Sequence, residues 1–222
     1  MNINKIIRTN RKTIAIIVES DGRLVVRAPL RVSDKDIYRL VRKKEKWIRR
    51  KQEQVKQQAP RLRARKFANG EPFLYLGEVY ELLLVERSRP LLLLNEHFEL
   101  SREVLPRAEE IFIKWYREAA RRVITERIDI CARDNNFQYE RIRITSARTR
   151  WGSCNSKGGL NFTWRLVMAP MPIIDYVVLH ELIHTEIKNH SKKFWNKVET
   201  IMPEYRLHYD WLRENGYLLA QF

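Results

Sequence analysis

The segment from residue 169 to residue 190 limits the possible folds more than any other part of the chain. An apolar run, Ile173–Leu179, follows two prolines and leads directly into the motif HELIH at residues 180–184. Prolines at the start and apolar residues on every side are typical of a helix buried in a core. Since residues four apart share one face of a helix, His180 and His184 are expected to project side by side from this buried helix.

This HExxH spacing predicts a metal centre. Two imidazoles on one helical face can bind one ion, and Glu181 beside the first can take a proton from water at that ion. The helix should end near residues 188–189, where a chain reversal would bring His190 back as a third ligand. Three protein ligands and an open position are typical of catalytic zinc. The sequence therefore predicts Zn²⁺ at His180, His184 and His190, with Glu181 as base; the alternative is ordinary polar histidines, with His190 capping the next helix.

Further candidates lie around this centre. A hydrogen-bond donor for a tetrahedral oxyanion is expected among Tyr205, His208 and Tyr209, of which Tyr205 is preferred, although each could simply be a packing residue. Asp175 or Glu186 could orient the imidazoles.

Three arginines and a cysteine precede the helix. Arg148, Arg150 and Arg165 are candidates for contacts with an anionic group of a substrate. Cys154 could approach the metal, but a small buried side chain is the expectation favoured here.

The motifs of the carboxy-terminal half resemble a known family. They are RWGSC at residues 150–154, the strand LNFTWRL at 160–166, DYVV at 175–178, NHS at 189–191 and FW at 194–195. In this pattern the chain is similar to the YgjP-like family of zinc-dependent metallopeptidase-type proteins, which is related to the SprT-like proteins and to the zincin group. The resemblance implies a zincin-type fold with the same three ligands and Glu181 as base. The activities of that family include nucleotide hydrolysis as well as peptide hydrolysis.

The expected fold class is α+β, in which a zincin-like core places the HExxH helix beside a mixed sheet. Residues 1–100 are expected to form a β-hairpin-rich region containing one long basic helix at residues 33–58, with Ser33 as its cap. The pair Asp21-Gly22 indicates one of the hairpins. Residues 101–222 are expected to form the catalytic domain.

Charge gives a second clue to partners. The chain carries 43 Lys and Arg against 27 Asp and Glu, a net charge of +16. Residues 33–66 hold 14 of these cations and 4 of the anions, so this segment alone contributes +10. The basic surface around residues 39–66 could bind a nucleic acid or be a solvated helix face. The positive charge also fits a nucleoside triphosphate that Arg148, Arg150 or Arg165 would draw toward the metal.

The composition predicts a cytoplasmic protein that does not enter a membrane. No apolar run approaches the roughly twenty residues of a membrane span. Residues 1–18 lack the continuous apolar segment of a secretion signal. Cys131 and Cys154 lie far apart, as expected in a reducing compartment.

Three classes of function therefore remain open. The leading one is a zinc metallopeptidase. The second is a metal-dependent nucleoside triphosphate pyrophosphatase or phosphohydrolase, acting for example on UTP. The third is a nucleic-acid-associated binding protein, against which Glu181 argues because a structural zinc site needs no base.

Overall fold

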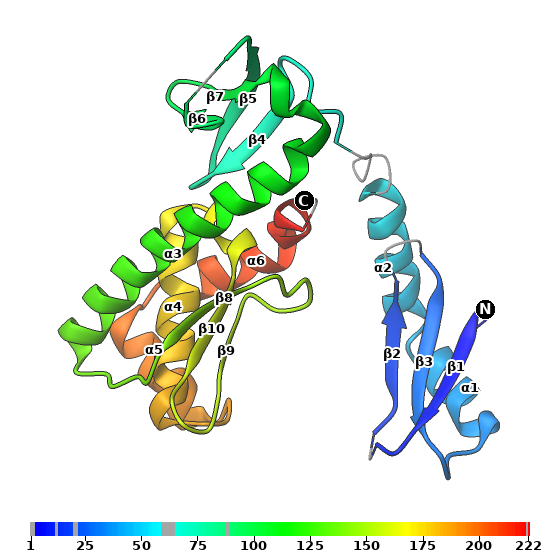
Figure 1. The fold of residues 1–222 in the computed structure, drawn as a ribbon. Helices are drawn as coiled ribbons and strands as arrows, with labels where there is room; N and C mark the ends of the chain where they lie inside the picture. Colours follow the sequence, from blue (N-terminus) through cyan, green and yellow to red (C-terminus); the bar gives the residue numbers. More distant parts are fainter. Residues whose placement is uncertain (1–2, 12, 20–21, 59–64, 88, 221) are drawn as a thin grey trace. The chain divides into compact units, whose positions relative to one another are not determined.

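The computed structural model describes residues 3–11, 13–19, 22–58, 65–87, 89–220 and 222, without the side chains of residues 51 and 54–58. The chain forms two compact α+β units, Met1–Ala64 and Arg65–Phe222 (Figure 1). Each unit has a hydrophobic core of its own. None of the helices within the described ranges is long and apolar enough to cross a membrane.

The first unit is a three-stranded sheet with two helices. Its elements are β1 (Lys5–Thr9), β2 (Ala15–Val18), β3 (Leu24–Pro29), α1 (Asp34–Lys43) and α2 (Glu45–Gln58). The central strand β3 is parallel to β1 and antiparallel to β2. The β2–β3 pair is the hairpin predicted at Asp21-Gly22, although Asp21 itself lies outside the described residues. Alternate residues of β3 meet the helices in a small core made by Leu24, Val26, Ala28, Ile37, Val41 and Ile48.

The single helix predicted over residues 33–58 is in fact two helices. The chain leaves helical geometry at Lys44 (φ −102°, ψ 10°), where α1 ends. Arg42 and Lys43 lie in the last turn of α1, and Glu45 lies in the first turn of α2. The break thus places basic side chains at the carboxy-terminal end of α1, which carries a partial negative charge, and an acidic side chain at the amino-terminal end of α2, which carries a partial positive charge. Both arrangements stabilise the short helices.

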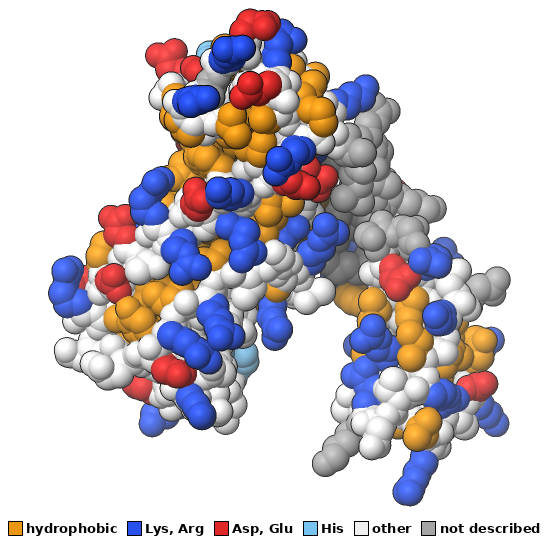
Figure 2. Space-filling model, in the orientation of Figure 1, with side chains coloured by type: hydrophobic (Ala, Val, Ile, Leu, Met, Phe, Trp, Pro, Cys, Tyr) orange, Lys and Arg blue, Asp and Glu red, His pale blue; other side chains and the backbone are white. Residues whose placement is uncertain are grey.

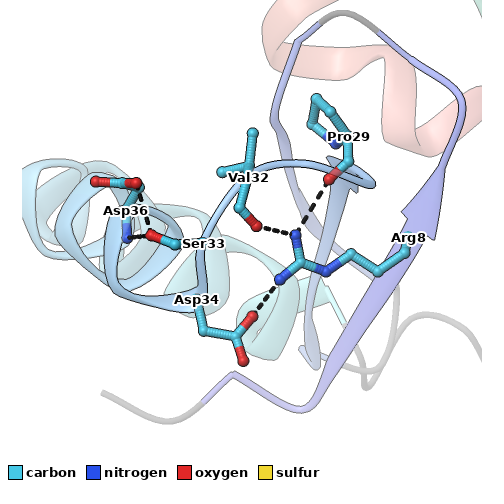
Figure 3. A network of polar contacts seen from close by, with 6 residues as sticks. All are labelled: Arg8, Pro29, Val32, Ser33, Asp34 and Asp36. Atoms are coloured by element: carbon cyan, nitrogen blue, oxygen red, sulfur yellow. Dashed lines mark hydrogen bonds and ion pairs between the residues drawn. The ribbon is translucent and has the colours of Figure 1, made fainter.

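The start of α1 is fixed by a polar network, shown in Figure 3. The Arg8 guanidinium donates hydrogen bonds to the carbonyl oxygens of Pro29 and Val32 and pairs with Asp34. Ser33 caps the helix as predicted, because its hydroxyl oxygen accepts a hydrogen bond of 3.2 Å from the Asp36 amide.

The second unit contains two sheets and four α-helices in its described residues. The first sheet has the order β4-β5-β7-β6 and the second the order β8-β10-β9. The strands are β4 (Pro72–Tyr75), β5 (Glu78–Val85), β6 (Leu92–Leu94), β7 (Phe98–Ser101), β8 (Ile142–Thr145), β9 (Gly152–Cys154) and β10 (Leu160–Thr163). The helices are α3 (Ala108–Asn135), α4 (Met171–Glu186), α5 (Lys192–Ile201) and α6 (Tyr205–Leu219), with 3₁₀ segments η2 (Arg102–Arg107) and η3 (Trp164–Met168).

The compact units divide at residue 64, whereas the sequence suggested a boundary near residue 100. Residues 65–100 belong to the second unit because the first sheet packs on α3. The Phe112 ring of α3 lies 4.1 Å from the Phe73 ring of β4 and 5.2 Å from the Phe98 ring of β7, measured between centroids. The Tyr116 hydroxyl also donates a hydrogen bond of 2.7 Å to the Leu74 carbonyl oxygen.

The turn between β4 and β5 rests on the end of η3 and on Pro170, which together lead into α4. The Leu76 and Gly77 amides donate hydrogen bonds of 2.9 and 3.2 Å to the carbonyl oxygens of Val167 and Met168. Gly77 has φ +89°, and a Cβ added there would lie 2.8 Å from the Pro170 Cγ. Only glycine allows both this backbone conformation and this approach.

Helix α4 is the buried helix that the apolar run predicted. It begins at Met171 after Pro170 and has contacts with α3, α5, α6 and strand β9. Asp175 of α4 forms a two-pronged ion pair with Arg127 of α3, with N···O distances of 2.5 and 2.9 Å. Edge strand β9 lies beside the half of α4 that carries the histidines, so the second sheet borders the candidate site.

Candidate metal centre

The three predicted histidines come together at the carboxy-terminal end of α4. His180 and His184 lie one turn apart on this helix, and the next segment returns the chain so that His190 faces both. The His190 Nε2 atom lies 2.9 Å from the His180 Nε2 atom and 3.1 Å from the His184 Nε2 atom. These residues form the histidine cluster able to hold a metal ion among the described residues.

The return of the chain depends on the end of α4. Ile187 is extended, and its carbonyl oxygen lies 2.9 Å from the His184 Nδ1 atom. The Asn189 side chain accepts a hydrogen bond of 3.3 Å from the Ser191 amide, closing a turn around His190. Because a carbonyl can only accept, Nδ1 of a neutral His184 carries the hydrogen, and its Nε2 lone pair faces the cluster.

The donor set fits a zinc ion. Three imidazole nitrogens converge, and Zn–N bonds of ordinary length in a tetrahedral site place such nitrogens about 3.3 Å apart. Burial, followed by the charges of His184 and His190, lowers the pKa of His180 to about 3. Burial likewise lowers the pKa of His184. Both rings are therefore neutral near pH 7, the form in which imidazole binds a metal.

An aromatic floor supports the imidazoles. Phe194 of α5 is fully buried, and its ring centroid lies 4.6 Å from His184, 4.8 Å from His190 and 4.9 Å from His180. The Trp195 ring stacks on His190 at 5.8 Å. This floor keeps water away from one side of the cluster, which accounts for the burial that lowers the imidazole pKa values.

Glu181 is buried beside the cluster, with 6% of its surface exposed. Its carboxyl group lies against β9, where a Cβ added at Gly152 would be 2.5 Å from the Glu181 Cγ and 2.6 Å from its Oε1. Burial raises the pKa of Glu181 to about 7, and the positive charge of Arg150 acts in the opposite direction. A carboxyl group with such a pKa can both accept and release a proton near neutral pH.

A pocket of about 410 Å³ opens onto His180 and Glu181. One wall is the segment entering β9, with Arg150 and Trp151; α4 contributes Tyr176, and α6 contributes further side chains. Tyr176 lies one helical turn before His180, so the periodicity that identified the histidines could also have identified this tyrosine. The residues of α6, Tyr209, Leu212 and Arg213, are distant in sequence, and only Tyr209 was considered from its position.

Other candidates from the sequence do not line this pocket. The preferred oxyanion donor, Tyr205, is buried with its ring stacked on Trp195 at 5.5 Å, and its hydroxyl oxygen accepts a hydrogen bond of 3.3 Å from the Arg206 Nε. Arg165 is 4% exposed and donates hydrogen bonds to the Phe222 carbonyl oxygen at 2.6 and 3.1 Å. Arg148 is exposed outside the pocket lining. Of the three arginines, only Arg150 lies beside Glu181.

Asp175 and Glu186, which were expected to orient the imidazoles, form ion pairs with other residues instead. Asp175 pairs with Arg127, and Glu186 pairs with Lys197 at 2.5 Å. Neither is placed to orient a histidine, and the backbone carbonyl of Ile187 orients His184 in their place. Cys154 is partly buried, its Sγ lies 3.3 Å from the Asn155 carbonyl oxygen, and burial raises its pKa.

A helix with two histidines four residues apart, a third histidine from the following turn and a buried carboxyl group facing a pocket define a metallopeptidase-type hydrolase. The chain belongs to the YgjP-like family, because the family model of the YgjP-like metallopeptidase domain matches residues 12–215. The resemblance found in the sequence motifs is thereby confirmed. Searches of the curated proteins and of the solved structures gave no match.

Proposed function

We propose that this protein is a zinc-dependent peptidase in which His180, His184 and His190 hold the metal and Glu181 is the general base. The observation that carries the proposal is a buried carboxyl group beside three converging imidazole nitrogens at an open pocket. A structural zinc site has no use for such a carboxyl group. Membership of a metallopeptidase family makes a peptide the expected substrate.

The residues of the pocket can divide the chemical work. When bound, zinc would supply Lewis acidity and lower the pKa of water at the site. Glu181 would remove a proton from the attacking water and return it to the leaving nitrogen. Tyr176 is 3% exposed, lines the pocket and has no hydrogen-bond partner for its hydroxyl among the described residues. We propose this hydroxyl, in place of that of Tyr205, as the donor to the developing oxyanion.

Mass spectrometry of cleaved polypeptides tests this function. Zinc-loaded wild type is incubated with denatured polypeptides alongside Glu181→Gln and Glu186→Gln. Glu186 is the matched control because it lies on the same helix, is exposed and pairs with Lys197 away from the pocket. New peptides should form with wild type and Glu186→Gln, and should be lost with Glu181→Gln or a chelator. Cleavage that persists in Glu181→Gln would disprove the assigned base.

A metal-dependent nucleoside triphosphate hydrolase is the second candidate. Arg150 and Arg213 line the pocket together with Trp151 and Tyr209, and such a combination could hold phosphates and a base. The same incubation with UTP and other nucleoside triphosphates decides between the two. Nucleotide products that depend on Glu181, without any new peptides, would replace the peptidase by this activity.

Nucleic-acid binding by the first unit is the third candidate, and charge favours it. This unit carries 19 Lys and Arg against 6 Asp and Glu, so it holds +13 of the net +16. Figure 2 shows basic side chains spread over its visible face. Between residues 39 and 66, Arg61, Arg63 and the side chains of Lys51 and Lys56 lie outside the described part of the chain, and the other cations are exposed or partly exposed. Binding to single-stranded RNA that weakens steeply with salt would support this role; a salt-independent affinity would contradict it.

A cytoplasmic location remains a prediction. The two cysteines, Cys131 and Cys154, are unpaired, in agreement with a reducing compartment.

A further inference from the structure

The pocket beside Glu181 carries two positive side chains with different surroundings. Arg213 of α6 pairs with Asp210 at 3.0 Å and with Glu214 at 3.5 Å. Arg150 is exposed, and among the described residues no carboxylate forms an ion pair with it. The charge of Arg213 is therefore balanced by its own helix, whereas the charge of Arg150 is available to a ligand.

The rest of the wall is largely apolar and aromatic. Val177 of α4 and Leu212 of α6 lie in the wall with Trp151, Tyr176 and Tyr209. Pockets that bind organic groups combine such a surface with a few polar groups that fix orientation. A large apolar or aromatic side chain fits this wall, and a volume of about 410 Å³ leaves room for it together with a neighbouring residue.

Contact with the backbone of α6 fixes the position of the Trp151 ring. A Cβ added at Gly216 would lie 2.8 Å from the Trp151 Cζ2, so the indole rests directly on the helix backbone. Trp151 in turn directly follows Arg150 and precedes Gly152, which lies against Glu181. Three consecutive residues therefore fix the relative positions of the Arg150 guanidinium, the Trp151 indole and, through Gly152, the proposed base Glu181.

We infer that this pocket binds a substrate residue with a large apolar or aromatic side chain next to a carboxylate, and that Arg150 pairs with this carboxylate. The inference rests on the proposed peptidase function and names its substrate class. The carboxylate has two possible sources, the α-carboxylate of a substrate that ends in this residue or the side chain of a neighbouring Asp or Glu.

Three peptides of matched length test the inference and separate the sources. One ends in phenylalanine with a free acid, one ends in phenylalanine amide, and one ends in an amide with glutamate before the phenylalanine. Binding to zinc-loaded Glu181→Gln is measured by calorimetry, and cleavage by zinc-loaded wild type is measured in parallel. Binding does not require turnover, so the two measurements can fail independently.

The free acid, or the glutamate peptide, should bind roughly tenfold or more tightly than the plain amide, as expected for one charge-assisted hydrogen bond. Adding Arg150→Gln should remove this preference and leave amide binding nearly unchanged. Arg148→Gln, two residues away and outside the pocket lining, is the matched control and should preserve the preference.

Equal binding of all three peptides, or a preference that survives Arg150→Gln, would overturn the inference. If wild type then still cleaves them, the peptidase function stands and only the substrate class is wrong. If binding prefers the carboxylate but no peptide is ever cleaved, the proposed function fails and the pocket assignment remains. A nucleoside triphosphate that displaces every peptide and binds more tightly would assign the pocket to nucleotides and overturn the inference.

Discussion

The two units of the chain place their charged groups in opposite environments. The first unit carries a net charge of +13 on 64 residues around a small core. The second unit has 24 Lys and Arg against 21 Asp and Glu, a net charge of +3, around a core that extends from its first sheet to α6. The described cations of the first unit are exposed or partly exposed to solvent, whereas the second unit buries a glutamate and half-buries two histidines in an aromatic surrounding.

This difference separates two uses of charge. An exposed cation keeps its charge, is screened by salt and can bind many anionic surfaces. A buried titratable group changes its proton affinity, as the shifted pKa values of His180 and Glu181 show. We therefore expect the second unit to carry out the reaction and the first unit to attract anionic partners over a long range.

The largest expected effect is the loss of zinc from the second unit in His180→Ala. Zinc affinity should fall roughly 100- to 1000-fold, since ~10–16 kcal/mol shared among four ligand positions is ~2.5–4 kcal/mol for each ligand. In wild type, excess zinc should raise the unfolding temperature of the second unit alone. Calorimetry and metal analysis measure both quantities. The exposed His97 provides the control, and zinc lost equally from His97→Ala would contradict the three-histidine centre.

The next effect concerns the buried carboxyl group in metal-free protein. The pKa of Glu181 is raised to about 7 in the folded state from 4.5, so the folded state holds this proton more tightly. The stability that this proton contributes is present below pH 4.5 and is lost as the pH rises through 7. Relative to Glu181→Gln, wild type should therefore lose about 3 kcal/mol between pH 4.5 and pH 8.

Urea denaturation in a chelator at several pH values measures this difference. The first unit should show no such change between the two proteins. A stability difference that is the same at pH 5 and pH 8 would refute the raised pKa.

A smaller effect is expected for Gly152→Ala in strand β9. Its Cβ would lie 2.5 Å from the Glu181 Cγ, so the carboxyl group or the strand must move. Overpacking of this kind costs about 1–3 kcal/mol, and peptide cleavage should decrease because the proposed base, Glu181, is displaced. Ser153→Ala, in the same strand, should retain activity. Full cleavage by Gly152→Ala would show that the position of Glu181 tolerates movement.

The smallest effect is expected in the first unit for Ser33→Ala. Loss of the cap on α1 should cost about 1 kcal/mol of unfolding free energy in that unit. Zinc affinity and peptide cleavage should remain unchanged. Denaturation followed by a probe in each unit measures the two stabilities, and an equal loss in both would show that the units unfold together.

Local patterns accounted for the elements that could be predicted from the sequence. The buried helix with His180 and His184, the cap at Ser33 and the β2–β3 hairpin each follow from a few neighbouring residues. The alternation from residue 160 to 166 predicted one strand, but β10 ends at Thr163 and Trp164 begins the segment η3. Alternation describes burial, and η3 buries all five of its residues, so the pattern could not mark where the strand ends.

Features that depend on distant contacts were not predictable in this way. An arginine such as Arg165 could bind an anion, yet this one donates its hydrogen bonds to the carbonyl oxygens of Ser146 and of Phe222, 57 residues later. The pocket side of α6 could not be known before its packing on α4, and so Tyr205 was preferred to the residues that do line the pocket. The division into compact units at residue 64 likewise depends on the packing of Phe73 and Phe98 on Phe112, which joins residues far apart in the chain.

The tip of the β4–β5 hairpin has a consequence for engineering this protein. Hairpin tips are ordinarily where insertions, labels and circular permutation are tolerated. Here the amides of Leu76 and Gly77 bind the end of η3, two residues before α4, and Gly77 leaves no room for a side chain against Pro170. A graft at this turn would move the first residues of the helix that carries Tyr176 and the histidines. This hairpin therefore helps to position α4, and it is a poor site for a fusion.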